Sequence, residues 1–252
     1  MKLNIITSYP KSGNTWMRFI LYNLVYESGS IHESANIDKY IPNLHSIKIE
    51  NNKLLFDEGT IGKKLFLSTH FSYNQIKNFP IDKIIIVIRN PLDVLVSLIN
   101  YYKLDLKKID ELVDEFATTH NLDFLKNNYN FPSWSEHIDS YKNSNKNFIF
   151  INYSKLLNEF EKQIENLCNF LEIDYSSLNI NDIKKNTSFE NLKSIEIKEK
   201  ENNLDGFFTR STKDKNIHFM NLGKSNGYKD LLTDMQILKL NESTEMIYQQ
   251  FI

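Results

Sequence analysis

The chain has 252 residues, 41% of them hydrophobic, and a formal net charge of −2, which suits one large globular domain or two small ones. A net charge so near zero excludes a general attraction to nucleic acid or to an anionic membrane, so any anion-binding site must be a local basic pocket. The sequence has no apolar stretch of membrane-spanning length, no signal-peptide pattern and only one cysteine, Cys168, so we expect a cytoplasmic protein without a membrane span or an internal disulfide.

The first predicted unit is a strand, a tight loop and a helix. The strand is the apolar run 3–6, and the helix follows from apolar residues at helical spacing over 16–25. The loop between them reads Thr-Ser-Tyr-Pro-Lys-Ser-Gly-Asn-Thr-Trp over residues 7–16. A loop in this position directs backbone N–H groups into one hollow, and the helix N-terminus adds its positive dipole end.

The side chains of this loop suit an anion. Lys11 supplies a positive charge, Gly13 permits a close backbone approach or a positive φ, and donors come from Ser12, Asn14 and Thr15. The sequence therefore predicts a cradle for phosphate or sulfate, although an ordinary surface turn has a similar composition. The loop is not a Walker A motif, because no Gly-Lys-Ser/Thr closes it. The Gly-Lys-Ser at 223–225 lacks the upstream glycine, and we attribute that match to chance.

Further along the chain, residues 27–60 are polar and are expected to be irregular. Residues 64–68 predict a short buried strand, and the β-branched run 84–88 is typical of a strand buried on both faces of a parallel sheet. Asn90-Pro91 predicts the start of a helix that reaches Tyr102, with Asn as the N-cap and Pro as the first helical residue. Asp93, three residues after Asn90, is expected to form a carboxylate variant of the capping box.

The second half of the chain continues the alternation of strands and helices. We expect a charged insertion at 103–133, a helix at 134–141, a strand at 148–151, a helix at 154–171, a short helix around 186–189, a mobile loop at 196–229 and a closing helix at about 229–248. No composition shift marks a linker. The pattern predicts a single α/β domain over residues 1–252, with a central parallel sheet flanked by helices.

Polar residues follow the ends of several predicted strands: Lys11, His70, Arg89 and Tyr153. Each has a structural explanation by itself, such as a buried imidazole for His70 or a core ring for Tyr153. In open parallel sheets, however, ligands bind beyond the carboxyl ends of the strands. Together these residues predict a binding site at one edge of the sheet.

These motifs resemble those of PAPS-dependent sulfotransferases. Residues 9–16, Tyr-Pro-Lys-Ser-Gly-Asn-Thr-Trp, are similar to the family's 5′-phosphosulfate loop Y-P-K-S-G-T-T-W, and residues 89–97 are similar to its 3′-phosphate motif R-N-P-x-D-x-x-x-S. Weaker matches follow in the family's order: Thr69-His70 to K-T-H, the segment 151–153 with its Tyr, 187–189 to T-S-F, and 219–223 with 228–229 to F-M-R-K-G…W-K. The matches span nearly the whole chain.

The resemblance implies a P-loop-like three-layer α/β sandwich that transfers a sulfuryl group in line, without a metal. The donor is PAPS, the product is PAP, and the acceptor is a hydroxyl or amine of a small molecule or glycan. Lys11 and His70 are implied as catalytic, with His70 as the general base, because an imidazole pKa near 6.5 suits proton transfer at neutral pH. The implied donor-binding residues are Lys11, Ser12, Gly13, Asn14, Thr15, Trp16, Arg89, Ser97, Tyr153, Thr187, Phe189, Phe219, Met220 and Gly223.

Two positions depart from the family pattern. Ser68 stands where K-T-H has its lysine, and Asn221-Leu222 stand where the family has Arg-Lys, with Arg210 or Lys224 as candidate replacements. Two other functions remain open: a P-loop-type small-molecule kinase that uses ATP, and a non-catalytic nucleotide-binding protein. The missing Walker A glycine argues against the kinase, and His70 argues for an enzyme. The acceptor and the oligomeric state are not predicted, but we expect the acceptor pocket to come from loops 27–60, 103–133 and 196–218.

Overall fold

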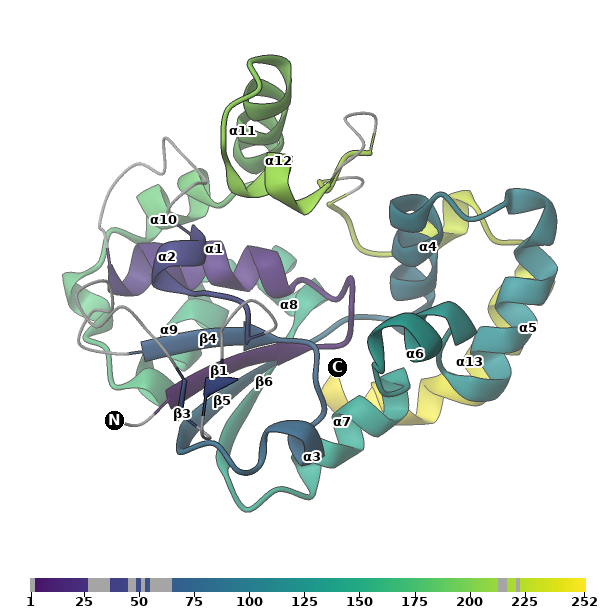
Figure 1. Cartoon of the computed structure of the whole chain (residues 1–252), viewed down its shortest axis with the longest axis horizontal. Coiled ribbons are helices and arrows are strands. Elements are labelled where there is room, and N and C mark those ends of the chain that lie inside the picture. The colour runs from purple at the N-terminus through teal and green to yellow at the C-terminus, as the bar shows by residue number, and fades with distance from the viewer. Residues whose placement is uncertain are drawn as a thin grey trace.

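The computed structural model describes residues 3–26, 37–44, 49–50, 53–54, 65–212, 217–220 and 223–252. Its centre is a four-stranded parallel sheet in the order β4-β1-β5-β6 (Figure 1). The strands are β1 (Leu3–Ser8), β4 (Leu65–Thr69), β5 (Ile81–Ile88) and β6 (Asn147–Asn152). All four coincide with predicted strands, so the expected parallel α/β sheet is confirmed. A small antiparallel pair, β2 (Ile49–Glu50) and β3 (Lys53–Leu54), lies outside this sheet.

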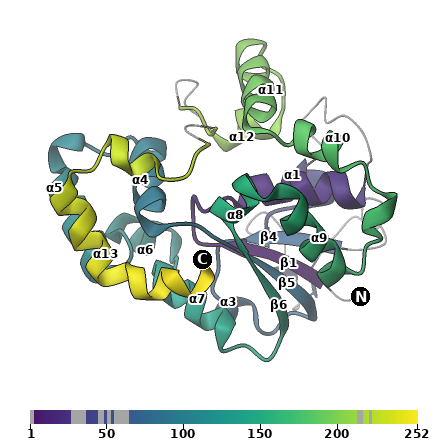
Figure 2. The same cartoon turned by 180° about the vertical axis from the view of Figure 1, so that it is seen from behind.

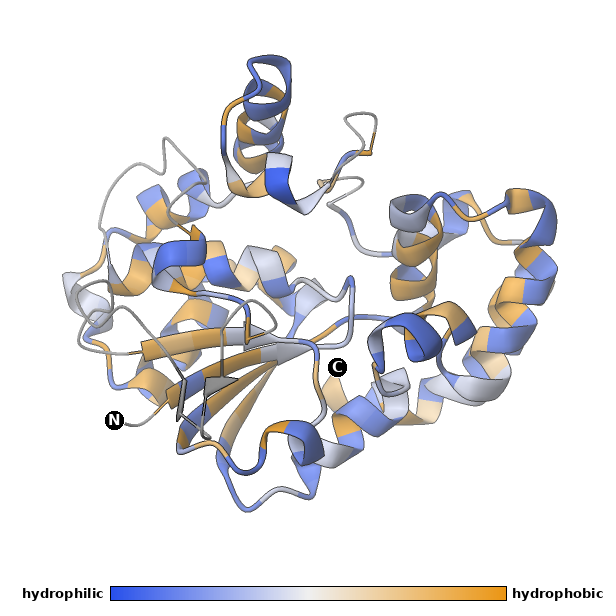
Figure 3. Ribbon diagram, in the orientation of Figure 1, coloured by the Kyte–Doolittle hydropathy of each residue, from blue (hydrophilic) through white to orange (hydrophobic). Residues whose placement is uncertain are grey.

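Alternate side chains of β5 enter two different hydrophobic clusters, one on each face of the sheet. Ile84, Ile86 and Ile88 pack with α4 (Pro91–Tyr102), α5 (Ile109–Thr119), α7 (Trp134–Lys142) and α13 (Asp234–Tyr248). Ile85 and Val87 pack with α1 (Asn14–Val25), α9 (Phe160–Leu171), α11 (Phe189–Glu201) and α12 (Phe207–Ser211). Figures 1 and 2 show these two helical groups on opposite sides of the apolar strands, which Figure 3 colours orange. The predicted three-layer arrangement is confirmed.

The start of α4 is formed as predicted at its N-cap. The side chain of Asn90 accepts a hydrogen bond from the N–H of Leu92 at 2.9 Å, and Pro91 opens the helix. Asp93, however, does not complete a capping box. Its carboxylate instead accepts the backbone N–H groups of Asn226, at 2.9 Å, and Tyr228, at 3.2 Å. A long-range partner has replaced the local one that the sequence pattern suggested.

Residues 103–133, which were expected to be a charged insertion, are packed on the core. They form α5 and α6 (Asp123–Tyr129), and their buried residues Val113, Phe116 and Leu125 belong to the main hydrophobic cluster. The expectation of a mobile loop at 196–229 is wrong for the part of this segment that the structure describes. Helix α11 continues to Glu201, α12 follows, and a 3₁₀ turn spans Gly227–Asp230.

Several other boundaries differ from the sequence-based expectation. The helix expected over 154–171 is divided at Glu159 into α8 (Tyr153–Asn158) and α9. The short helix expected around 186–189 is instead the junction between α10 (Ile180–Asn186) and α11. The last helix, α13, begins only after its N-cap Thr233.

The described part of the chain also has two short helices, α2 (Ile37–Tyr40) and α3 (Tyr73–Ile76), and further 3₁₀ helices at Leu106–Lys108, Tyr175–Ser177 and Gln249–Phe251. Within the described residues, no helix combines the length and the apolar character that a membrane crossing requires.

Candidate active site

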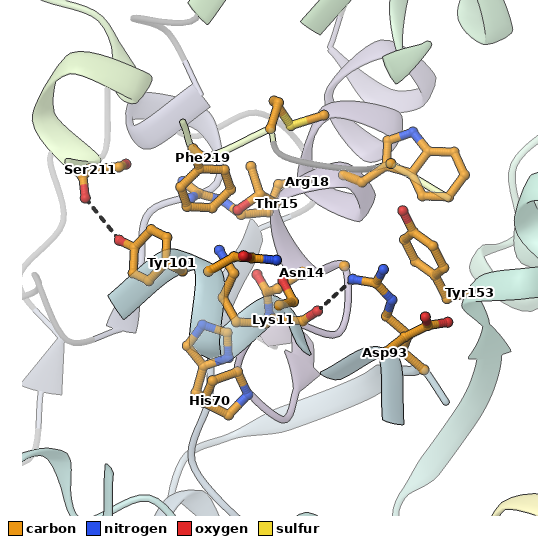
Figure 4. A pocket seen from close by; sticks show the side chains of 18 of the residues that line it. Lys11, Asn14, Thr15, Arg18, His70, Asp93, Tyr101, Tyr153, Ser211 and Phe219 are labelled. Carbon is orange, nitrogen blue, oxygen red and sulfur yellow. Dashed lines mark hydrogen bonds between the residues drawn. The ribbon is translucent and has the colours of Figure 1, made fainter. Parts of the chain in front are cut away.

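The carboxyl ends of the four parallel strands lie side by side, because Thr7 pairs with Thr69, Ser8 with Val87, and Ile88 with Asn152. Lys11, His70, Arg89 and Tyr153 follow these strand ends and line one cavity of about 350 Å³ (Figure 4). Helix α1, after β1, covers one face of the sheet, and α4, after β5, covers the other. The cavity therefore lies where chain connections leave neighbouring strands toward opposite faces, the usual ligand position in such sheets.

Most of the predicted site residues line this cavity: Lys11, Gly13, Asn14, Thr15, Trp16, His70, Arg89, Ser97, Tyr153, Phe189, Phe219, Met220 and Gly223. Two do not. Ser12 is 1% exposed and is not among the lining residues, and Thr187 is fully buried, with its hydroxyl donating to the carbonyl of Ile183. The structure thus brings together residues that are 212 positions apart in the chain, from Lys11 to Gly223.

The loop after β1 adopts the conformation that its glycine suggested. Gly13 has a φ of 107°, and a Cβ at this position would lie 2.8 Å from the ring of Tyr153. Lys11 also has a positive φ, 64°. The side chain of Asn14 turns away from the loop and donates to the carbonyl of Thr69 at 3.1 Å. The loop is therefore fixed by backbone conformation and by contact with β4 and Tyr153.

Lys11 points its ammonium group between two aromatic rings. Its Nζ lies 3.7 Å from the ring centroid of Tyr101 and 4.2 Å from that of Phe219. Burial, and secondarily the charge of Arg89, lower the pKa of Lys11 to about 7, while Glu196 acts in the opposite direction. An anion placed near Lys11 would favour its protonated form.

Arg89 connects the first loop to the C-terminal part of the chain. Its guanidinium donates to the carbonyls of Lys11 and Lys224, each at 3.1 Å, and lies 4.5 Å from the ring centroid of Tyr153. Its Nε is buried and makes no hydrogen bond within the described residues. Asp93, on the next turn, also lines the cavity, and burial raises the pKa of its carboxyl while Arg89 opposes that shift.

The hydrogen bonding of His70 sets its tautomer. Its Nδ1 lies 2.8 Å from the carbonyl oxygen of Ser8, which can only accept, so we assign the ring proton to Nδ1. In the neutral ring, Nε2 is then left as a proton acceptor. A second histidine, His137, lies behind it; it is 1% exposed, and its Nε2 lies 2.9 Å from the hydroxyl of Thr7. Sequence reasoning missed His137, because a histidine in a helical pattern carries no signal of its partner.

One end of the cavity is bordered by Trp16, Tyr153 and Phe189. The rings of Trp16 and Tyr153 meet edge to face at 5.3 Å, and the indole N–H of Trp16 donates to the carbonyl of Thr187 at 2.8 Å. Phe189 lies against Gly223, where a Cβ would come within 2.0 Å of its ring. Because Gly223 also has a φ of 60°, a larger residue would be excluded there by both contact and conformation.

Five aromatic residues of the lining were not predicted residue by residue: Tyr101, Tyr102, Tyr129, Phe131 and Phe207. The rest of the lining comprises Pro10, Arg18, Asn43, Asp93, Val96, Asn100, Leu157 and Ser211. Phe131 meets His70 edge to face at 5.7 Å and stacks on Tyr129 at 5.4 Å. Part of the expected acceptor loop, 103–133, therefore does reach the site, although as helices and their connections.

The two departures from the family pattern have different outcomes. Ser68 is 1% exposed and does not line the cavity. Asn221-Leu222 lie outside the described residues. Of their suggested replacements, Arg210 pairs with Asp38 and Asp205, at 3.1 and 2.9 Å, and Lys224 pairs with Asp230, so neither side chain is among the cavity-lining residues.

A parallel sheet with a strand–loop–helix cradle, and with Lys11, Arg18, Arg89 and a histidine around one cavity, defines an α/β protein suited to an anionic ligand beside a proton acceptor. The sulfotransferase domain family model matches residues 3–251. The chain therefore belongs to the sulfotransferase family. This confirms the class predicted from the motifs, a PAPS-dependent sulfotransferase.

The chain is similar to proteins from distant organisms. It is 26% identical to cytosolic sulfotransferase 1 of Danio rerio, with 98% of this chain and 81% of that protein covered. It is 30% identical to cytosolic sulfotransferase 7 of Arabidopsis thaliana, with 77% of this chain and 64% of that protein covered. A mouse sulfotransferase complexed with PAP has a similar fold, with a TM-score of 0.66 at 21% identity over 98% of this chain and 85% of that one.

Proposed function

We propose that this sulfotransferase moves a sulfuryl group from PAPS to the hydroxyl of a small aromatic or otherwise apolar acceptor, with His70 as general base. The observation that carries the proposal is that Lys11, Arg89 and His70, whose Nδ1 faces the carbonyl of Ser8, line one cavity. The solved structure with the similar fold contains PAP, which supports PAPS as the donor. We further propose that residues 1–252 act as a single domain, since the site draws on both ends of the chain.

The residues of the cavity suit this donor. Near the predicted phosphosulfate position, Ser12 Oγ is buried and makes no hydrogen bond within the described residues, and Gly13 has no side chain to fill the hollow. At the predicted 3′-phosphate position, Arg89 Nε is likewise without a partner there, and Ser97 lines the cavity. Lys11 and the loop N–H groups would hold the phosphosulfate, Arg89 and Ser97 the 3′-phosphate, and Trp16, Tyr153 and Phe189 the adenine.

The transfer itself would depend on positioning and charge. PAPS supplies an activated sulfuryl group whose departure leaves negative charge on the phosphate side. Lys11 would stabilise that charge, and His70 Nε2 would remove the proton of the acceptor hydroxyl. Because the carbonyl of Ser8 accepts the proton on Nδ1, the neutral ring would keep Nε2 as its basic nitrogen.

The acceptor class follows from the lining around His70. Phe131 touches the His70 ring, and Tyr129 and Tyr102 continue the aromatic surface. Such a surface favours a planar or apolar hydroxyl compound, since a glycan needs several hydrogen-bonding groups. One structure with a similar fold, a retinol dehydratase, was solved with androsterone and PAP, at 15% identity and a TM-score of 0.64. We therefore propose a phenol or an apolar alcohol in preference to a glycan.

The test combines a binding assay with an acceptor panel. PAP at about a hundred times its dissociation constant is expected to stabilise the fold by about 2.7 kcal/mol, and ATP by far less. Labelled PAPS is then offered with phenols, apolar alcohols and sugars, and we expect transfer to the first two. Equal stabilisation by ATP would favour the kinase; PAP binding without transfer to any acceptor would favour a non-catalytic nucleotide-binding protein.

His70→Ala tests the base. We expect PAP affinity to stay near that of the unmodified protein and turnover to fall about 10²–10⁴-fold, the usual loss when a general base is removed. Unchanged turnover, with chemistry shown to be rate-limiting, would exclude His70 from this role. We also propose a cytoplasmic location, as the names of the two cytosolic relatives suggest.

A further inference from the structure

Helix α11 carries charged side chains that are buried instead of facing water. Glu196 has no exposed surface, Glu199 is 4% exposed, and Lys200 is 7% exposed. Charged side chains are almost never this buried unless they are paired. We therefore examine which groups pair with the buried carboxylate of Glu196.

Glu196 holds the backbone of the segment 217–220. Its carboxylate accepts the N–H groups of Phe219, at 2.6 Å, and Met220, at 2.8 Å. Lys200 lies 2.7 Å from the same carboxylate and also donates to the carbonyl of Ile217. The pair thus grips this segment through three backbone groups, and those bonds do not depend on the segment's side chains.

The gripped segment forms part of the wall around Lys11. Phe219 and Met220 line the cavity, and the Phe219 ring lies 4.2 Å from the Nζ of Lys11 (Figure 4). Tyr101 completes this aromatic contact, with its ring 5.8 Å from that of Phe219. The position of the Phe219 backbone therefore sets one side of the space available to the Lys11 ammonium group.

We propose that Glu196 is a positioning residue of the donor site: by fixing the backbone of Phe219 and Met220, it places the aromatic wall that holds Lys11 ready for the anionic donor. A role in stability alone would not call for this arrangement, because a buried ion pair is often replaceable by apolar residues without loss of stability. The proposal rests on the proposed donor site. Binding of PAP to the unmodified protein tests that site separately.

The main test compares three variants. Glu196→Gln keeps the shape of the side chain but lacks the second acceptor oxygen. The double variant Glu196→Gln/Lys200→Met removes both charges together, so it leaves no unpaired buried ion. Glu199→Gln is the matched control: it changes a buried carboxylate of the same helix that accepts the N–H of Phe208, at 3.1 Å. Stability and PAP affinity are measured for each.

We expect both variants that lack the Glu196 carboxylate to bind PAP about tenfold more weakly, in line with the loss of one charge-assisted hydrogen bond. Glu199→Gln is expected to stay within twofold of the unmodified protein. With PAPS and an acceptor, KM for PAPS is expected to rise more than kcat falls. Wild-type affinity in the double variant, or an equal loss in Glu199→Gln, would overturn the proposal; failure of the unmodified protein to bind PAP would instead overturn the donor site.

The pH profile of PAP binding supplies a readout that a purely structural role would not change. Lys11 faces Arg89 from the end of β5, Tyr101 from α4 and Glu196 from α11. Because the negative charge of Glu196 favours protonated Lys11, Glu196→Gln is expected to move the midpoint of the profile to lower pH. A general loss of folded protein would lower binding at every pH and leave the midpoint in place, and that result would contradict the proposal.

Discussion

At the scale of single residues, Lys11 is the most informative side chain. Its ammonium group lies against two aromatic rings and near a second cation, Arg89. Burial and the charge of Arg89 both make the protonated form of Lys11 less favourable than it is in water. Cation–π contacts offset part of that cost. A lysine in this state gains more from an arriving anion than a fully hydrated lysine would, since the anion replaces solvation that burial has already removed.

The lowered pKa of Lys11, about 7, gives the first prediction. The protonated form binds the donor, so PAP affinity should be greatest below pH 7 and fall up to tenfold per unit as the pH rises above it. The phosphates of PAP change little in this range, because their second pKa is near 6. Titration calorimetry from pH 6.5 to 9 measures the effect. Lys11→Arg is the control, because a guanidinium stays charged throughout and should give a flat profile.

Arg89 gives the second prediction. Arg89→Ala should weaken PAP by a factor of ten or more relative to adenosine 5′-phosphosulfate, since only PAP carries a 3′-phosphate and a charge-assisted bond contributes about 1.5–3 kcal/mol. The ratio of the two affinities is the measurement. It cancels the disturbance caused by losing the bonds to Lys11 and Lys224. Equal losses for both nucleotides would show that Arg89 does not read the 3′-phosphate.

How far the sequence predicts the site depends on how local each interaction is. Lys11, Gly13 and Asn90 act through their own turn or helix end, so their roles follow from the neighbouring residues. Asp93 and Glu196 act on backbone groups 133 and 23 residues away, whereas the sequence pattern predicted a local cap for Asp93 and a mobile loop for the segment that contains Glu196. Nothing in the residues around them identifies such distant partners.

At the scale of elements, α4 has a double attachment. Its Asn90 caps its own first turn, and its Asp93, 2% exposed, holds the backbone of the 3₁₀ turn near residues 226–228. The same helix supplies Ser97 and Tyr101 to the cavity. The first turn of α4 therefore does two things: it caps the helix through Asn90, and it positions the backbone near residues 226–228 through Asp93.

Asp93→Asn gives the third prediction. An amide oxygen can still accept, but the amide NH₂ would face a backbone N–H, so one bond becomes a repulsive contact. We expect a loss of about 1–3 kcal/mol in unfolding free energy, the usual cost of leaving a buried polar group unsatisfied. Denaturant titration measures it. Asp230→Asn, in an exposed pair with Lys224, is the control and should change stability by less than about 1 kcal/mol; an equal loss in both would show that the Asp93 contacts are not special.

The elements differ in how well the sequence predicts them. The four strands of the sheet are β-branched or apolar runs, and β1, β4 and most of β5 are buried, so composition alone identifies them. Helix α11 has the opposite character: lysine and glutamate are so dense at 196–201 that the sequence favours a loop. Pairing between charges and with backbone groups makes their burial tolerable, and that pairing exists only in the folded chain.

At the scale of the whole molecule, the sheet separates the two hydrophobic clusters, and buried polar groups lie near the carboxyl ends of its strands. His137 is among them. Burial lowers its pKa to about 3, with the nearby His70 as a secondary cause, so it stays neutral in the fold. In the unfolded chain an imidazole has a pKa near 6.5. Between these values the unfolded chain takes up a proton that the folded chain does not.

This difference gives the fourth prediction. As the pH falls from 6.5 toward 3, His137 should lower the unfolding free energy by up to about 1.4 kcal/mol per pH unit; above pH 6.5 it should have no effect. His137→Gln keeps a polar partner for Thr7 and removes the titration. Between pH 4 and 6, the slope of the unfolding free energy against pH should therefore decrease by nearly 1.4 kcal/mol per pH unit, which corresponds to the uptake of one proton. An unchanged slope would mean that His137 is not excluded from protonation in the fold.

The bonds of Arg89 to the carbonyls of Lys11 and Lys224 have a consequence for biosynthesis. A growing polypeptide leaves the ribosome from its N-terminus, so the loop of residues 7–16 emerges about two hundred residues before the segment that contains Lys224. Until position 228 or so has emerged, Asp93 lacks its backbone donors and Arg89 one of its two acceptors. A nascent chain would therefore complete the contacts of Arg89 and Asp93 only after this segment has emerged.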